Sequence, residues 1–322
     1  MIHTYAIPLR ARFRRLDARD GMLLRGEAGV GEFSPFWDYD DAEAASWLRA
    51  ALESAHLGWP TPRRGRVPVN VTIPAVGPAR AAELVRASGG CRTAKVKVAE
   101  PGESLEEELN RVAAVRDALG PGGKIRVDAN GGWDVETAIT HLRALDRAAG
   151  GLEYAEQPCL PVPDLARVRR AVSVPVAADE SIRRASDPLE VARQDAADIM
   201  VVKVQPLGGV RAALDIIEQV GLPAVVSSAL ESSVGIAAGV ALAAALPELP
   251  FACGLATINL FTTDTAARPL VPEGGSLPVL PAGALTLRPD LERTAADAAT
   301  TERWNDRLAR VRRLLVEEGI QP

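Results

Sequence analysis

The chain has 322 residues, of which 47% are hydrophobic and 25% are charged, and its formal net charge is -5 at pH 7. This mild acidity gives no electrostatic support to a nucleic-acid-binding protein or a protein of the membrane surface. The length suits one large α/β barrel with a smaller companion domain.

The cysteines and the N-terminal segment indicate a protein of the cytoplasm. Cys91, Cys159 and Cys253 are widely separated and odd in number, which fits neither a disulfide framework nor a zinc cluster. The first segment, Met1–Arg15, lacks the apolar core of a signal peptide, and the apolar run Val234–Leu246 is too short to span a membrane. We therefore expect a chain that is neither exported nor anchored.

Residues 1–66 predict a small α+β unit. Loose alternation of apolar residues through residues 1–30 indicates antiparallel strands. Residues 29–36 are rich in glycine and aromatic residues, and we interpret them as a loop, either a simple connection or a lid. From Asp41 apolar residues recur at helical spacing, and Gly and Pro residues mark a linker within 58–66.

From Val67 to residue 257, strand-like and helix-like runs alternate. The expected strands are Val67–Ile73, Thr93–Val98, Lys124–Asn130, Leu152–Gln157, Pro175–Asp179, Asp198–Val204, Ala224–Ser228 and Phe251–Leu255. Such alternation predicts parallel strands joined by right-handed crossovers, and about eight of them close a TIM-type barrel. The helical spacing of Thr300–Glu318 predicts a final helix. We expect it to pack on the N-terminal unit, with capping of the barrel bottom as the alternative.

Three carboxylates end consecutive predicted strands. Asp128, Glu156 and Asp179 each follow an apolar run, one βα unit apart, so they are expected at the same rim of the barrel. Hard oxygen donors without histidine favour Mg2+ over zinc. Asn130 and Glu180 lie next to these ligands in sequence and are expected around the site.

Three lysines lie in or beside apolar strand runs. Lys95 and Lys97 are two apart, so both point to the same side of their strand, and Lys203 lies on the sixth strand, roughly across the barrel. Burial and neighbouring cations lower the pKa of a lysine and enable it to act as a base. Lysine opposite a metal-bound carboxylate suits proton abstraction beside that carboxylate. For Lys95 we favour a structural role, in which its ammonium extends to the rim or pairs with a carboxylate.

The combined pattern resembles the enolase superfamily, specifically its muconate lactonizing enzyme subgroup. The pattern consists of KVK, then DAN, EQP and DES one unit apart, then the lysine of KVQPLGG. The resemblance implies an α/β fold, namely a modified TIM barrel, (β/α)7β, over residues 67–257. It also implies an α+β capping domain of residues 1–66 completed by residues 258–322. By matching position, Asp128, Glu156 and Asp179 resemble the Mg2+ ligands, and Lys97 and Lys203 resemble the two catalytic lysines, a pairing already known for this superfamily.

Within that subgroup the chain most resembles the o-succinylbenzoate synthase family of menaquinone biosynthesis. The stretches that carry this resemblance are GEFSPF at Gly31–Phe36, Arg126 and SSALESSVG at Ser227–Gly235. It implies a lyase in which Lys97 removes the proton α to a ring carboxylate and then protonates the departing hydroxyl, while Lys203 stabilises the anion. Carboxylate oxygens of the substrate are expected to bind groups around Ser227, Ser228 and Gly254, although serine near a helix start is equally typical of a cap.

Other readings stay open. An N-succinylamino acid racemase or a cycloisomerase uses the same scaffold, because fold and metal site do not fix the substrate. A racemase needs both lysines as acid and base. A non-catalytic dicarboxylate-binding protein would not need the acidic cluster. The sequence leaves the oligomeric state open, and a monomer is compatible with it.

Overall fold

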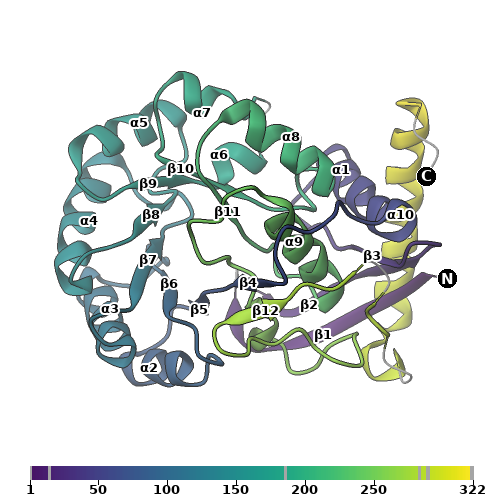
Figure 1. The fold of residues 1–322 in the computed structure, drawn as a ribbon, viewed down its shortest axis with the longest axis horizontal. Coiled ribbons are helices and arrows are strands. Elements are labelled where there is room, and N and C mark those ends of the chain that lie inside the picture. The colour runs from purple at the N-terminus through teal and green to yellow at the C-terminus, as the bar shows by residue number, and fades with distance from the viewer. Residues whose placement is uncertain (1, 14–15, 185–186, 282–283, 288–290, 320–322) are drawn as a thin grey trace.

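The computed structural model describes residues 2–13, 16–184, 187–281, 284–287 and 291–319. Figure 1 shows a curled sheet ringed by helices, with a smaller unit of strands and helices at the side that holds both termini. The predicted class, a modified α/β barrel with an α+β capping unit, is confirmed. Among the described residues, no helix combines the length and the apolar character needed to cross a bilayer.

The capping unit begins with an antiparallel sheet in the order β1-β2-β3. Its strands are β1 (Ile2–Phe13), β2 (Leu16–Arg25) and β3 (Val30–Phe33). Helix α1 (Asp41–Leu52) follows, and it starts with a capping box because Asp40 and Glu43 bond each other's backbone N–H groups. A π-helical turn (Glu53–Leu57) ends this helical segment.

The interpretation of residues 29–36 as a loop is wrong. Val30–Phe33 is a strand, and residues 31–36 are all buried. Gly31 explains the close packing, because a Cβ at this position would overlap the carbonyl oxygen of Ala51 in helix α1. This segment is part of the core of the capping unit and not an open lid.

The barrel contains seven parallel strands in the order β11-β10-β9-β8-β7-β6-β5. They are β5 (Val71–Ile73), β6 (Thr93–Lys97), β7 (Lys124–Asp128), β8 (Tyr154–Glu156), β9 (Val176–Ala178), β10 (Ile199–Val202) and β11 (Ala224–Val226). The surrounding helices are α2 (Pro78–Arg86), α3 (Leu105–Leu119), α4 (Val135–Ala149), α5 (Val162–Ala171), α6 (Glu180–Arg183), α7 (Glu190–Arg193), α8 (Val210–Val220) and α9 (Ser233–Ala245).

The first and last predicted strands differ from expectation. Val67–Ile73 divides into β4 (Arg66–Pro68) and β5, and β4 pairs with β12 (Ser276–Pro278) outside the barrel sheet. Phe251–Leu255 forms only isolated parallel bridges, from Cys253 to Val69 and from Gly254 to Ser227. These two bridges still join the edges of the seven-stranded sheet, so the ring closes.

The C-terminal segment returns to the capping unit. After the 3-10 turns Thr257–Leu260 and Leu291–Thr294, helix α10 (Ala298–Glu317) lies beside α1 (Figure 1). Its Trp304 packs edge-on against Phe33 with ring centroids 5.7 Å apart. We propose the division into a capping unit of residues 1–66 and 258–322 and a barrel of residues 67–257. Leu270 and Leu277 pack in the barrel core, so the returning segment first crosses the barrel.

Candidate active site at the carboxyl ends of the strands

Five of the predicted residues stand at the same rim. Lys97, Asp128 and Glu156 end strands β6, β7 and β8, and their Cα atoms are register partners in neighbouring strands. Asp179 directly follows β9, and Lys203 directly follows β10. The strands are short and mostly buried, so each one places the polar side chain at or just after its carboxyl end at the rim.

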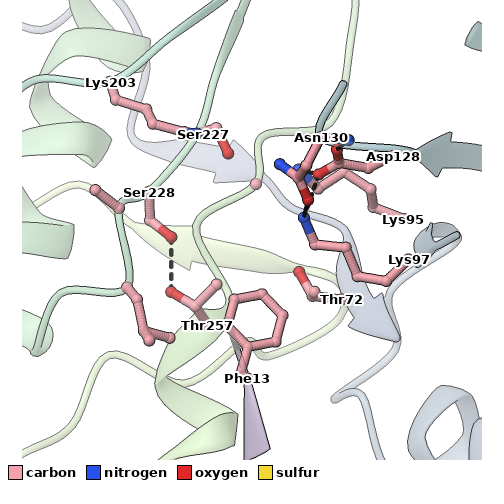
Figure 2. A pocket seen from close by; sticks show the side chains of 13 residues that line it. Phe13, Thr72, Lys95, Lys97, Asp128, Asn130, Lys203, Ser227, Ser228 and Thr257 are labelled. Atoms are coloured by element: carbon pink, nitrogen blue, oxygen red, sulfur yellow. Dashed lines mark hydrogen bonds and ion pairs between the residues drawn. The ribbon is translucent and has the colours of Figure 1, made fainter. Parts of the chain in front are cut away.

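Two lysines of β6 share one carboxylate. The Lys95 ammonium donates to Oδ2 of Asp128 at 2.9 Å and to Oε1 of Glu156 at 2.8 Å. The Lys97 ammonium donates to the same Asp128 oxygen at 2.6 Å and to Oδ1 of Asn130 (Figure 2). Lys95 thus pairs with carboxylates, as the sequence suggested.

A second cluster surrounds Asp179. Its Oδ2 accepts from the Lys203 ammonium at 2.5 Å, and its Oδ1 accepts from Nε of Arg183 at 2.9 Å. Arg183 also donates to Glu180 and to the hydroxyl of Tyr39 in the capping unit. The carboxylate of Asp179 is therefore held from both sides.

Burial dominates the electrostatics of these groups. It raises the pKa of the Glu156 carboxyl to about 7, and the nearby carboxylates of Asp128 and Asp179 add to the rise. Burial also disfavours ionised Asp128, but the ammonium groups of Lys95 and Lys97 outweigh this effect and hold the pKa of Asp128 below its usual range. Burial lowers the pKa of Lys203, and the attraction of Asp179 offsets only part of that shift.

Most predicted residues face one pocket, which Figure 2 shows from close by. Those that line it are Lys95, Lys97, Asp128, Asn130, Lys203, Ser227, Ser228 and Gly254. The pocket holds only about 30 Å³, roughly one water molecule. A wider cleft of about 440 Å³ adjoins it and shares Phe13, Lys97 and Asn130. A ring-sized ligand must therefore displace lysine side chains or the end of β1.

The donor set fits a divalent cation in its chemistry. Among the described residues, no three His, Cys, Asp or Glu side chains already converge at metal-binding distances, because lysine ammonium groups lie against the carboxylates. Yet Oε2 of Glu156 is buried with no hydrogen-bond partner in the described part of the chain. Three buried carboxylates with one unsatisfied oxygen are suited to Mg2+, which prefers such ligands.

The backbone N–H groups around the two serines already donate hydrogen bonds within the barrel. The N–H groups of Ser227, Ser228 and Gly254 donate to carbonyl oxygens of the barrel ring, at 2.8 to 3.0 Å. These three N–H groups are therefore not available to a substrate carboxylate, and the predicted binding around Ser227 and Ser228 stays a prediction that rests on their two hydroxyls. Ser228 already shares its hydroxyl with Thr257 at 2.7 Å. Gly254 provides space instead, since a Cβ there would lie 2.5 Å from Oγ of Ser227.

Arg126 does not line the pocket. Its side chain is fully buried inside the barrel, where it donates to Glu153, to Asn70 and to the carbonyl oxygen of Ala252. Its guanidinium also stacks over the ring of Tyr154 at 4.6 Å. The position two residues before Asp128 places Arg126 one layer deeper on the same inward face. Arg126 was predicted either to bind substrate or to lie around the site, and its position below the pocket is compatible with the second alternative, which stays a prediction.

Other pocket residues went unrecognised in the sequence. They are Phe13, Thr72, Ala229, Leu230 and Thr257. Phe13 comes from the capping sheet, and nothing in its local pattern marks it. Arg183 was also missed, although its position four residues after Asp179 places both on one face of a helical turn.

Lysine is scarce in this chain, and that is a signal the sequence offered. Only four of the 37 basic Lys and Arg residues are lysines, and three of these line the pocket. Arginine stays protonated in proteins, whereas buried lysine can release its proton. The presence of lysine rather than arginine at these three pocket positions therefore favours a role in proton transfer.

Known proteins resemble this chain over nearly its whole length. Residues 4–55 match the family model of enolase N-terminal domain-like proteins, and residues 78–291 match that of enolase C-terminal domain-like proteins. The o-succinylbenzoate synthase of Thermobifida fusca is 63% identical over 275 residues, covering 85% of this chain and 86% of the relative. That of Mycobacterium tuberculosis H37Rv is 50% identical over 318 residues, covering 98% and 94%.

Solved structures agree in fold. A muconate lactonizing enzyme of Pseudomonas fluorescens, complexed with muconolactone, has a TM-score of 0.77 at 24% identity and covers 92% of this chain and 98% of its own. The L-Ala-D/L-Glu epimerase of Bacillus subtilis has a TM-score of 0.76 at 22% identity, with the same coverage. Because these two neighbours have different activities, this likeness extends to the fold alone.

Proposed function

The chain belongs to the o-succinylbenzoate synthase family of enolase-like proteins, and from this premise we propose that it is a Mg2+-dependent hydro-lyase. Its reaction dehydrates 2-succinyl-6-hydroxy-2,4-cyclohexadiene-1-carboxylate to 2-succinylbenzoate in menaquinone biosynthesis. One observation carries the proposal beyond the family name. Lys97 and Lys203 face the same pocket, and each donates to a buried carboxylate, Lys97 to Asp128 and Lys203 to Asp179.

Lys97 is the proposed acid and base. Its neutral amine takes the proton from the ring carbon that bears the carboxylate, and the electron pair of that C–H bond is held as an anion shared with the carboxylate. The same nitrogen then gives the proton to the hydroxyl on the same face, the C–O bond breaks as the electron pair forms a ring double bond, and water leaves. A syn elimination of this kind needs only one acid/base group. Asn130, whose Oδ1 accepts from Lys97, orients it.

Lys203 stabilises the anion. It comes from the opposite side of the pocket to Lys97 (Figure 2), so a ring between them has a lysine on each face, with Lys97 as the base and Lys203 as the cation. A cation over an electron-rich ring is favourable, and more so where water is excluded. Arg183 and Asp179 fix the position of this lysine through the contact of Asp179 with both.

Asp128, Glu156 and Asp179 are the proposed holders of Mg2+. When bound, the ion supplies charge stabilisation for the substrate carboxylate as negative charge develops on it. Asn130 donates to Glu180 at 3.1 Å, and this contact keeps both side chains beside the carboxylates. The hydroxyls of Ser227 and Ser228 are proposed to bind the substrate across the pocket.

A second activity deserves testing because both lysines line the pocket. An N-succinylamino acid racemase would use Lys97 and Lys203 as acid and base on opposite faces of one carbon.

We also propose a cytoplasmic location, supported by three cysteines that form no disulfide bond.

The direct test is turnover by the purified chain. Protein, Mg2+ and the cyclohexadiene substrate are incubated, the loss of the diene absorbance is followed, and the product is identified by mass. Formation of 2-succinylbenzoate that stops when a chelator removes Mg2+ is the expected result. Unchanged substrate at high protein concentration would overturn the proposal.

A further inference from the structure

A carboxylate of the capping unit holds the start of a barrel helix. Glu32 of β3 is 3% exposed, and its Oε2 accepts from the hydroxyl of Ser232 at 2.5 Å and from the N–H of Gly235 at 3.1 Å. Both Glu32 oxygens also lie within reach of the Ser232 N–H, at 3.1 and 3.2 Å. Ser232 is the N-cap of α9, which lies next to β3 (Figure 1).

A buried arginine of the capping unit holds a residue two positions before that N-cap. Nε of Arg19 donates to the carbonyl oxygen of Leu230 at 2.9 Å. The guanidinium stacks over the ring of Phe36 at 4.3 Å and also donates to the carbonyl oxygen of Ser34. Arg19 is 1% exposed, so its donors have no competition from solvent.

The segment held in this way forms a wall of the pocket. Residues 227–230 all line the pocket opposite Lys97. Leu230 has a φ of 62°, a left-handed conformation that is costly for a leucine. Such a conformation persists only where surrounding contacts impose it, and the bond from Arg19 is such a contact.

We propose that Glu32 and Arg19 are positioning residues, which keep the wall of residues 227–230 in the shape that binds the substrate. This inference rests on the proposed function and deepens it. The capping unit then influences substrate specificity through the side chains of Glu32 and Arg19, which contact the pocket wall and the start of α9 but do not touch the substrate. Loosening the wall weakens substrate binding, while the proton transfer by Lys97 on the other side continues.

The chain offers a matched control. Glu53 of the capping unit caps a different barrel helix in the same manner, since its carboxylate accepts from the N–H groups of Val210 and Arg211 at the start of α8. The segment before α8, residues 204–209, does not line the pocket. Loss of the Glu53 charge therefore removes an equivalent contact between the two units without touching the wall.

The experiment compares Glu32→Gln, Arg19→Lys and Glu53→Gln with the unmodified chain. Steady-state kinetics give KM and kcat for the cyclohexadiene substrate, and hydrogen exchange reports the backbone of residues 227–235. We expect Glu32→Gln and Arg19→Lys to raise KM about tenfold with kcat changed less than about twofold, as for loss of a charge-assisted hydrogen bond that acts on binding. Glu53→Gln is expected to leave both constants unchanged.

The outcomes separate the possibilities. An unchanged KM in both wall variants, an equal rise in Glu53→Gln, or a fall in kcat alone would overturn the inference. If Glu32→Gln does not fold, Arg19→Lys carries the kinetic test. If the unmodified chain has no synthase activity, the proposed function fails. Hydrogen exchange then decides: faster exchange of residues 227–235 in the wall variants alone supports the positioning role, and equal exchange in all three variants contradicts it.

Discussion

The Lys97 ammonium lies 2.6 Å from Oδ2 of Asp128, so the proposed base and a proposed metal ligand share a hydrogen bond. The same oxygen also accepts from Lys95. A divalent cation held by Asp128 would compete with these two ammonium groups, so Asp128 would couple the metal site to the position of Lys97.

Replacement of Lys97 by alanine should abolish synthesis. The acid/base group is lost, so kcat should fall by at least about 10³-fold while the fold persists. Lys124→Ala is the matched control, because Lys124 is exposed at the opposite end of β7. The measurement is the rate of 2-succinylbenzoate formation, with circular dichroism for the fold. Near-normal activity of Lys97→Ala would refute its role.

Lys203→Arg separates the synthase from a racemase. Arginine keeps the positive charge but cannot exchange a proton, so a synthase should lose less than about 10²-fold in kcat. A racemase would stop exchanging the α-proton of one enantiomer. The measurement is turnover together with deuterium uptake from heavy water into both enantiomers of an N-succinylamino acid. Rapid exchange from both enantiomers by the unmodified chain would contradict a synthase without racemase activity.

Asp128→Asn should weaken the binding of Mg2+ and remove activity together. Loss of a directly binding carboxylate is expected to lower the affinity by at least about 10²-fold, since even outer contacts of metal sites reach this range. Calorimetric titration with Mg2+ measures the affinity. Added Mg2+ should also raise the melting temperature of the unmodified chain and not that of the variant. Equal affinity in both proteins would rule out Asp128 as a ligand.

Glu231→Gln should make stability less dependent on pH. Burial, with the nearby Glu32 carboxylate adding to it, raises the pKa of Glu231 from 4.5 to about 7. Between these values the unfolded chain has lost the proton that the folded chain keeps, so the free energy of unfolding falls as pH rises and levels off above pH 7. The variant lacks this loss and should exceed the unmodified chain by up to about 3 kcal/mol at about pH 8, and by little at about pH 5.

Urea unfolding at these two pH values tests the prediction for Glu231. The exposed Glu27 supplies the control variant, Glu27→Gln. A difference between Glu231→Gln and the unmodified chain that is the same at both pH values would show that Glu231 does not titrate in this range.

The barrel and its rim were predictable because each strand carries its own signal. An apolar run that ends in Asp128, Glu156 or Asp179 combines a buried strand with a polar end, and equal spacing implies equal position in a barrel. Helices α3, α4 and α8 were likewise marked by period and by Gly at their ends. Each of these signals lies within one short stretch of the sequence.

The contacts between the units were not predictable, because they join residues far apart in sequence. Glu32 reaches a helix start 200 residues later, and Phe13 enters the pocket from the end of β1. The strand at residues 30–33 was missed because Gly31 suggested a loop, whereas its missing side chain serves close packing on α1. For Arg126 the spacing indicates the inward face but not the depth, so the sequence left open whether it binds substrate or lies behind the site.

A crystal structure with Mg2+ and 2-succinylbenzoate is the decisive experiment for the proposed active site. We expect Mg2+ to be bound by Asp128, Glu156 and Asp179, with the ring of the product between Lys97 and Lys203. The Lys97 ammonium should then have left Oδ2 of Asp128. A metal ion held by other residues, or a ring out of reach of Lys97, would refute the proposed roles of these residues.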